Sequence, residues 1–236
     1  PDNVSIAGGE PLIHPQIVDM VAFIAENDMK PIILTNAMAL TPESLRELKK
    51  AGLAGFTIHI DSRQSRPHWE GKTEGELNEL RQHYADMVAA EGGMYVIFNS
   101  TVYPSTFHEI PDVVRWGQAH IDRVHGLVFI TYRTAIGDAN VAHDYAGQEV
   151  DLSQLSYSRE RFDEKFVTSP EVYQIIKDNF PEYEAAAYLG GSILHTSYKW
   201  LAGAVIGSKK KMYGSVGKKT MEVAQAGHHM FAGTYL

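Results

Sequence analysis

Cysteine is absent from all 236 residues of the sequence. Disulfide bonds and thiolate metal ligands are therefore excluded within these residues. Long apolar runs are also missing, since none approaches the roughly 18 residues that a membrane-spanning helix requires. The first residues lack the basic segment and apolar core of a secretory signal. We therefore expect a cytoplasmic protein without a membrane span.

Positive charge is in deficit. Lys and Arg total 21 against 29 Asp and Glu, which gives a net charge of −8. A nucleic-acid binder needs a surplus of Lys and Arg to meet phosphates, so we expect no nucleic-acid partner. What is present is an ordinary globular composition, with 44% hydrophobic residues in a chain long enough to bury a sizeable core.

Apolar runs and amphipathic segments alternate up to Gly137. Strands are expected at 4–7, 32–34, 56–61, 95–98 and 127–130. Helix starts between them are marked by Pro15, Thr41–Pro42, Thr73–Glu76 and Pro111–Asp112. This α/β pattern predicts βα units around a parallel sheet. Periodicity alone leaves open whether the sheet is a partial barrel or an open doubly wound sheet.

The alternation of apolar runs and amphipathic segments ends at Gly137, and we place a domain boundary near residue 138. Residues 1–137 would form the sheet domain and residues 138–236 a mostly helical C-terminal extension. Helices are expected after Ser169-Pro170-Glu171, in part of 184–203, and over 218–231. The extension is expected to cover the barrel and shape the substrate pocket.

Polar residues follow four of the expected strands. They are Gly8-Gly9-Glu10-Pro11, Thr35-Asn36, Asp61-Ser62 and Asn99-Ser100-Thr101. Each group alone is typical of a turn or a helix cap. Their recurrence favours a ligand site, because parallel α/β architectures bind ligands at the carboxyl ends of their strands.

These groups, in this order, resemble the radical S-adenosylmethionine (radical SAM) superfamily. The resemblance begins with the strand before Gly-Gly-Glu-Pro and the helix after His14-Pro15, and covers about residues 4–136. The stretch 108–116 resembles the branch related to molybdenum-cofactor cyclases. The fold implied is a partial (β/α) barrel lacking its first βα unit.

The resemblance also implies roles for individual residues. Gly8, Gly9 and Glu10 would hold the methionine portion of S-adenosyl-L-methionine. Candidates for the ribose are Asn36, Asp61 and Ser62, and Asn99 is the candidate for the nucleoside region.

A 4Fe-4S cluster is the second cofactor that the resemblance implies, and its Cys-x-x-x-Cys-x-x-Cys loop is expected upstream of Pro1. The chemistry implied is reductive cleavage of S-adenosylmethionine to a 5′-deoxyadenosyl radical that abstracts a substrate hydrogen. Partners would be a small-molecule, lipid or peptide substrate and an electron donor such as flavodoxin or ferredoxin.

Two other readings stay open. A metal-dependent barrel hydrolase could use His59 and Asp61, which share one face of a strand, with His125, His14 or Glu10 as further ligands. Alternatively, the chain could be a non-enzymatic paralogue that binds S-adenosylmethionine without cleaving it.

Overall fold

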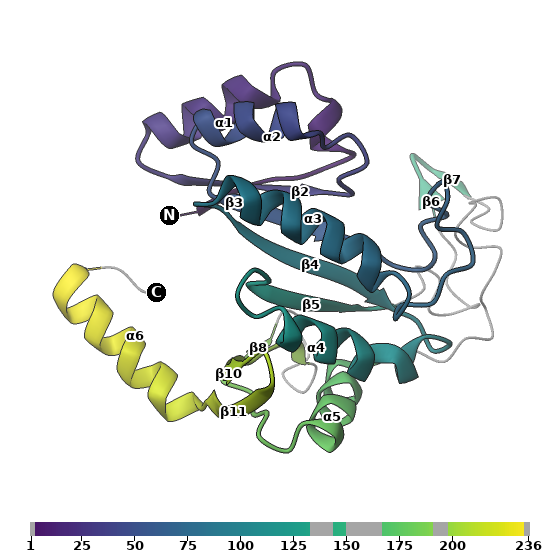
Figure 1. Cartoon of the computed structure of the whole chain (residues 1–236), viewed down its shortest axis with the longest axis vertical. Helices are drawn as coiled ribbons and strands as arrows, with labels where there is room; N and C mark the ends of the chain where they lie inside the picture. The colour runs from purple at the N-terminus through teal and green to yellow at the C-terminus, as the bar shows by residue number, and fades with distance from the viewer. Residues whose placement is uncertain (1–2, 133–143, 150–166, 191–197, 234–236) are drawn as a thin grey trace.

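The computed structural model of the chain describes residues 3–132, 144–149, 167–190 and 198–233. Its centre is a five-stranded sheet in which every neighbouring pair is parallel (Figure 1). The strands are β1 (Asn3–Ile6), β2 (Lys30–Thr35), β3 (Gly55–His59), β4 (Tyr95–Val102) and β5 (Gly126–Thr131). The predicted parallel α/β sheet is therefore confirmed.

The strand order in space is β1-β2-β3-β4-β5, identical to the order along the chain. A doubly wound sheet reverses its order at a switch point, whereas a barrel winds in one direction. The crossovers carry α1 (Ile17–Glu26), α2 (Pro42–Lys50), α3 (Asn78–Glu91) and α4 (Ile110–Ala119), with short 3₁₀ turns η1 (Pro11–Ile13) and η2 (Phe107–Glu109). The arrangement is that of a partial barrel.

One hydrophobic core joins the helices to one face of the sheet. Val21 of α1, Leu45 of α2 and Val88 of α3 are buried in the same cluster as Phe56 and Ile58 of β3. Along β3 and β4 the buried residues alternate with half-buried ones. The opposite face of the sheet therefore carries the half-buried side chains of these strands, among them His59, Asn99 and Thr101.

The helices between the strands begin at or within a few residues of the predicted positions. Thr41 and Ser44 form a capping box at the start of α2. Thr73 and Glu76 also bond each other reciprocally, at 2.9 and 3.1 Å, but α3 begins only at Asn78. The helix expected from Pro15 begins at Ile17.

The prediction for the extension was partly wrong. Part of the segment 184–203 was expected to be helical, but it contains β8 (Ala187–Gly190) and β9 (Tyr198–Ala202), which pair antiparallel. A second hairpin follows, formed by β10 (Ala204–Ser208) and β11 (Lys211–Val216). Val205, Ile206 and Tyr213 are residue types that favour strands.

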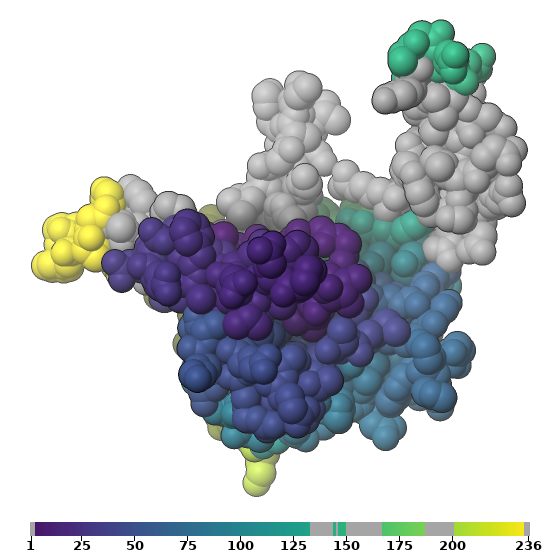
Figure 2. Space-filling view, turned by 90° about the horizontal axis from the view of Figure 1, so that it is seen from above, coloured from purple at the N-terminus to yellow at the C-terminus, as the bar shows by residue number. Residues whose placement is uncertain are grey.

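Two helices of the extension were predicted and are present, α5 (Ser169–Asn179) and α6 (Lys218–Ala232). The cap of α5 is Thr168, which shares a capping box with Glu171. A short hairpin, β6 (Asp144–Tyr145) with β7 (Gln148–Glu149), completes the described elements. Figure 2 looks down on the first βα units and shows α6 standing out at one side.

A second core joins the extension to the sheet domain. Val172 and Ile176 of α5 and Met212 of β11 are buried together with Ile110 of α4 and Val102 of β4. In the described part of the extension, α5 and the hairpin of β10 and β11 thus pack against α4, on the side of β5. Among the described helices, none is long and apolar enough to cross a membrane.

Candidate functional site at the strand ends

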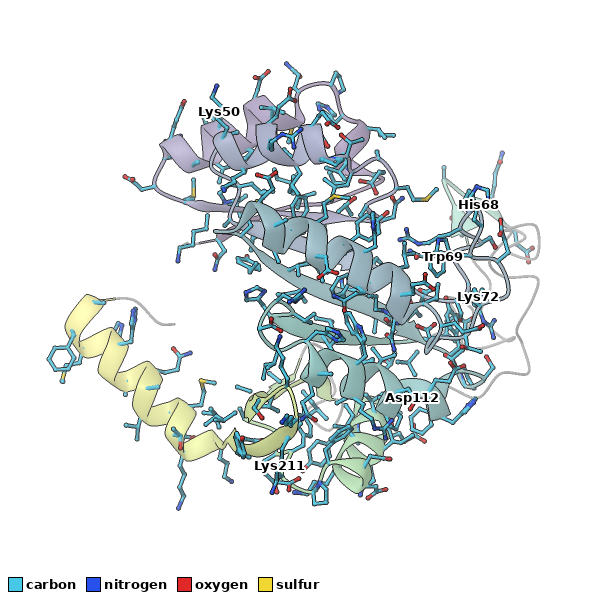
Figure 3. All side chains as sticks on the ribbon, in the orientation of Figure 1. Lys50, His68, Trp69, Lys72, Asp112 and Lys211 are labelled. Atoms are coloured by element: carbon cyan, nitrogen blue, oxygen red, sulfur yellow. The ribbon has the colours of Figure 1, made fainter. Side chains whose placement is uncertain are left out.

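The strands end at one side of the molecule, and the loops that follow them gather there. In Figure 3, His68, Trp69 and Lys72 of the loop after β3 lie at this side, as does Asp112 in the first turn of α4. Lys50, the last residue of α2, lies toward the opposite side. The predicted site residues belong to these strand-end loops, except Asn99, which lies within the second half of β4.

Gly8 and Gly9 expose their backbone directly after β1. Their φ angles are +103° and +55°, in the region that favours glycine. A Cβ built on either residue would meet no atom within 4 Å. The two peptide groups are therefore open to a ligand and need no side chain to hold their shape.

The Glu10 carboxylate joins the loop after β1 to the loop after β2. Its Oε1 accepts hydrogen bonds from the Leu12 N–H at 3.0 Å and the Thr35 hydroxyl at 2.5 Å. Its Oε2 accepts from the Asn36 N–H at 2.7 Å. A carboxylate has about four lone-pair positions, so capacity for one further donor remains.

Asn36 is the first residue after β2, and its side-chain Oδ1 accepts from the Met38 N–H at 2.8 Å. The next residue, Ala37, is fully buried with a φ of +59°, a conformation that is unfavourable for any residue with a Cβ. Such a backbone persists only where its surroundings hold it, and it is frequent at binding sites.

His59 and Asp61 form a hydrogen-bonded pair at the end of β3, with His59 Nε2 2.7 Å from Asp61 Oδ2. The Thr101 hydroxyl lies 3.2 Å from the same ring nitrogen, and Asp61 Oδ1 accepts from the Arg63 N–H at 2.9 Å. Burial acts to raise the pKa of Asp61, but the hydrogen bond and charge of His59 and the Arg63 N–H outweigh it and lower the pKa.

The two members of the pair differ in access. Asp61 is only 4% exposed, while the His59 side chain is 30% exposed. Asp61 is therefore shielded from solvent, and the His59 ring that it bonds is the more accessible member of the pair. His59 entered the sequence prediction only as a metal ligand, and its bond to Asp61 follows from their shared strand face.

Asn99 of β4 lies directly opposite His59 in the register of the sheet. Its side-chain Oδ1 is buried and has no hydrogen-bond partner among the described residues. An unpaired buried acceptor is costly unless a ligand or water supplies a donor. Ser62, by contrast, donates its backbone N–H to Glu74 at 2.7 Å.

Two buried arginines behind these residues were missed by sequence reasoning. Arg66, in the loop after β3, is 5% exposed, and Arg81 of α3 is fully buried. Arg81 pairs with Glu74 at 2.6 Å. A signal for Arg81 was present, because Leu77, Arg81, Tyr84 and Val88 share the helical spacing of an apolar stripe.

The metal ligands proposed for a hydrolase do not come together. His125 precedes β5 at the far end of the sheet, where its Nδ1 accepts from the Val96 N–H. The His14 ring accepts from the Gln16 N–H at 3.2 Å. In the part of the chain that the structure describes, no group of three His, Cys, Asp or Glu side chains could hold a metal ion.

An apolar cavity of about 740 Å³ lies apart from the polar strand ends. Its walls come from α4, α5, the hairpin residues around Gly203 and the length of β5. Val114, Leu127, Val172 and Met212 are among its lining residues. The cavity thus belongs to the junction between the sheet domain and the extension.

Comparison with known proteins identifies the family. Residues 1–117 match the family model described as the Radical SAM superfamily. The chain therefore belongs to the radical SAM superfamily, whose members are enzymes. The matched residues include every predicted site residue, from Gly8 to Asn99.

Individual relatives match over shorter stretches. A GTP 3′,8-cyclase from Alkaliphilus oremlandii is 36% identical over 80 residues, which are 34% of this chain and 25% of the relative. An AdoMet-dependent heme synthase from Methanosarcina barkeri is 29% identical over 63 residues, 27% of this chain and 18% of the relative. The chain thus spans a quarter or less of the length of these curated relatives.

Comparison with solved structures gives partial superpositions. A domain of pyruvate-formate lyase-activating enzyme from Bacteroides vulgatus superposes with a TM-score of 0.45 at 12% identity. The superposition covers 75% of this chain and 93% of that domain.

The residues present fit one of the two cofactors that the family implies. S-adenosylmethionine carries an ammonium group and hydroxyl groups, which match the free capacity of Glu10 and the unpaired Asn99 Oδ1. A 4Fe-4S cluster is held by thiolates. These residues do not fit such a cluster, because the sequence has no cysteine.

Proposed function

We propose that the protein containing this chain is a radical SAM enzyme that cleaves S-adenosylmethionine reductively to a 5′-deoxyadenosyl radical, which abstracts a hydrogen atom from a substrate. Membership of the superfamily supports this reaction class. Within it, the share of this chain is to bind and orient S-adenosylmethionine at the strand ends.

The observation that carries the binding role is the unpaired Oδ1 of Asn99. It lies on the face of the sheet that also carries His59, in a row of polar strand ends that begins at Gly8. A nucleoside offers amino and hydroxyl donors that would satisfy this acceptor. An apolar ligand would leave it unpaired at a cost of about 1–3 kcal/mol.

The proposed role of each residue at the strand ends follows from the chemistry of its side chain or backbone. Gly8 and Gly9 would meet the methionine portion with open peptide groups, and Glu10 would receive the ammonium at its remaining lone pair. For the ribose we propose Asn36, Ser62 and Asp61, the last through the His59 ring that it orients. Asn99 would receive a donor of the nucleoside.

The cluster that would supply the electron needs thiolate ligands from outside these 236 residues. We propose that an electron donor of the flavodoxin or ferredoxin kind reduces it. The substrate would be a small molecule, lipid or peptide, and the protein would act in the cytoplasm. Residues 138–236 would shape the substrate pocket, as an extension that packs against α4 beside β5.

The test replaces Asn99 by leucine in the intact protein, which removes the acceptor and keeps a similar size. We expect the affinity for S-adenosylmethionine, measured by calorimetry, to fall about two- to tenfold, since a lost hydrogen bond of this kind contributes about 0.5–1.5 kcal/mol. Asn179→Leu on α5 is the matched control, because Asn179 is exposed and bonds only within its helix. The Asn179→Leu variant should bind S-adenosylmethionine with the affinity of the wild type.

Product formation separates the proposed reaction from simple binding. The wild-type protein with its cluster reduced should release 5′-deoxyadenosine. Tight binding of S-adenosylmethionine without this product would favour the non-enzymatic alternative. An unchanged affinity in Asn99→Leu would remove Asn99 from the site.

A further inference from the structure

The buried Arg66 holds two neighbouring strand ends together. One nitrogen of its guanidinium, Nη2, donates to the backbone carbonyl of Asn36 at 2.6 Å and to that of His59 at 2.5 Å. Asn36 directly follows β2, and His59 is the last residue of β3. A single side chain therefore fixes the spacing between two residues of the proposed site.

The rest of the Arg66 side chain is also held. Its Nε donates to Gln64 Oε1 at 2.9 Å, and this oxygen also accepts from the Asp61 N–H at 3.2 Å. Tyr84 of α3 provides a further hydrogen-bond partner. A planar guanidinium with five donors can satisfy several acceptors at once, whereas a lysine ammonium cannot reproduce this geometry.

Asn36 is held from both sides as a result. Its N–H donates to the Glu10 carboxylate, and its carbonyl accepts from Arg66. The residue that follows has the strained φ of +59°. The backbone at Asn36 is thus fixed by two charged side chains, one anionic and one cationic, at the point where the loop after β2 turns away from the sheet.

Arg81 provides an internal comparison. It is buried even more completely, and its Nη2 donates to the Ile60 carbonyl and the Ser100 hydroxyl, each at 3.0 Å. Ile60 and Ser100 are themselves buried. Arg66 instead bonds the backbone of Asn36 and His59, which are only half-buried and lie on the polar side of the site.

We propose that Arg66 is a positioning residue of the S-adenosylmethionine site, which sets the placement of Asn36 and His59 for the adenosine portion of the ligand. This inference rests on the proposed function. Arg66 is only 5% exposed, so its effect on the ligand passes through the two residues whose carbonyls it binds.

The experiment compares two ligands in the intact holoprotein. S-adenosylmethionine contains both the amino-acid and the adenosine portions, while 5′-methylthioadenosine lacks the amino acid. Arg66→Lys should weaken both ligands by about tenfold, because the adenosine portion is common to them. Glu10→Gln should weaken S-adenosylmethionine more than 5′-methylthioadenosine, because only the first ligand carries the ammonium that Glu10 would meet. The readouts are the dissociation constants from calorimetry and the melting temperature.

Arg81→Lys is the matched control for the loss of a buried arginine. It should lower the melting temperature at least as much as Arg66→Lys and leave both dissociation constants within about twofold. Equal weakening of both ligands in the two lysine variants, or unchanged binding in Arg66→Lys, would overturn the inference while the proposed function stands. A wild-type protein that binds neither ligand would overturn both.

A second variant covers the case in which Arg66→Lys does not fold. Gln64→Leu removes the partner of Arg66 Nε and leaves the guanidinium in place. It should weaken both ligands about threefold with a melting temperature within a few degrees of the wild type. Unchanged binding in this variant would refute the positioning role.

Discussion

The buried pair of Arg81 and Glu74 allows a quantitative prediction for stability. Arg81 is fully buried and the Glu74 side chain is 5% exposed, with 2.6 Å between Nη2 and Oε2. Arg81 also donates to the Glu74 carbonyl, Asn78 Oδ1, the Ile60 carbonyl and the Ser100 hydroxyl. Arg81→Met removes these donors and leaves the Glu74 carboxylate buried without its cation.

Breaking a buried pair in this way costs about 3–5 kcal/mol of unfolding free energy. For a domain of about 150–250 residues, each kcal/mol lowers the melting temperature by roughly 2–4 °C. We therefore expect Arg81→Met to melt roughly 6–20 °C below the wild type. The assay is denaturant unfolding of the intact protein, with thermal unfolding as a second measurement.

The double variant tests the stated cause. Glu74→Gln removes the negative charge and keeps an oxygen that can accept from the Ser62 N–H. Arg81→Met combined with Glu74→Gln should be less destabilised than the sum of the two single variants, with a coupling of about 1–3 kcal/mol. Additive effects would refute the argument that the uncompensated charge dominates the cost.

Two further predictions concern the site carboxylates. Glu10→Ala should weaken S-adenosylmethionine binding by about 2–4 kcal/mol, because it removes the partner of the ammonium in a desolvated pair; calorimetry showing an unchanged affinity would exclude Glu10 from the site. The pKa of Asp61 is lowered in the folded state, so ionised Asp61 stabilises the fold above its unfolded pKa near 4. That stabilisation should be lost as the pH falls from about 4 through the lowered folded pKa. Asp61→Asn should flatten this acid dependence, measured by unfolding at pH 2–6, and an identical slope in the variant would contradict the assignment.

The sheet was predictable because its signals are local. The five strands contain short apolar runs, and two of the helices between them, α2 and α4, have a proline in their first two positions. Periodicity alone could not decide between barrel and open sheet, because that choice depends on strand order; the resemblance to the radical SAM superfamily implied the partial barrel. That order became visible only in the pairing of β1 through β5.

The extension was harder to predict for a physical reason. Part of the segment 184–203 was assigned as helical, yet β8 and β9 form a hairpin there. Short apolar runs fit a helix segment or a strand equally well by periodicity, and pairing with a partner strand decides between them. Residues 133–143 and 150–166, which include the predicted boundary near 138, lie outside the described residues.

The candidate site residues came from local patterns, whereas the side chains that hold them in place did not. Gly8, Asn36 and Asn99 were named because they follow the expected strands, and the structure places Gly8 and Asn36 just after β1 and β2 and Asn99 within β4. Arg66 contacts Asn36, which is 30 positions away in the sequence, and His59, which is seven positions away. No local sequence pattern indicates such contacts. The pairing of Glu10 with Asn36 is equally non-local.

The two outer strands of the sheet bear on how this polypeptide would behave as an isolated piece. Among the described residues, no strand pairs with the outer edge of β1 or of β5. β1 is only four residues long, but β5 has six and reads Gly-Leu-Val-Phe-Ile-Thr, uncharged and strongly β-forming. An unprotected edge of this kind is a template for pairing with a second chain. Residues 1–236 would therefore tend to join edge to edge, and turbidity or oligomers in a preparation of this polypeptide would report pairing at these outer strands.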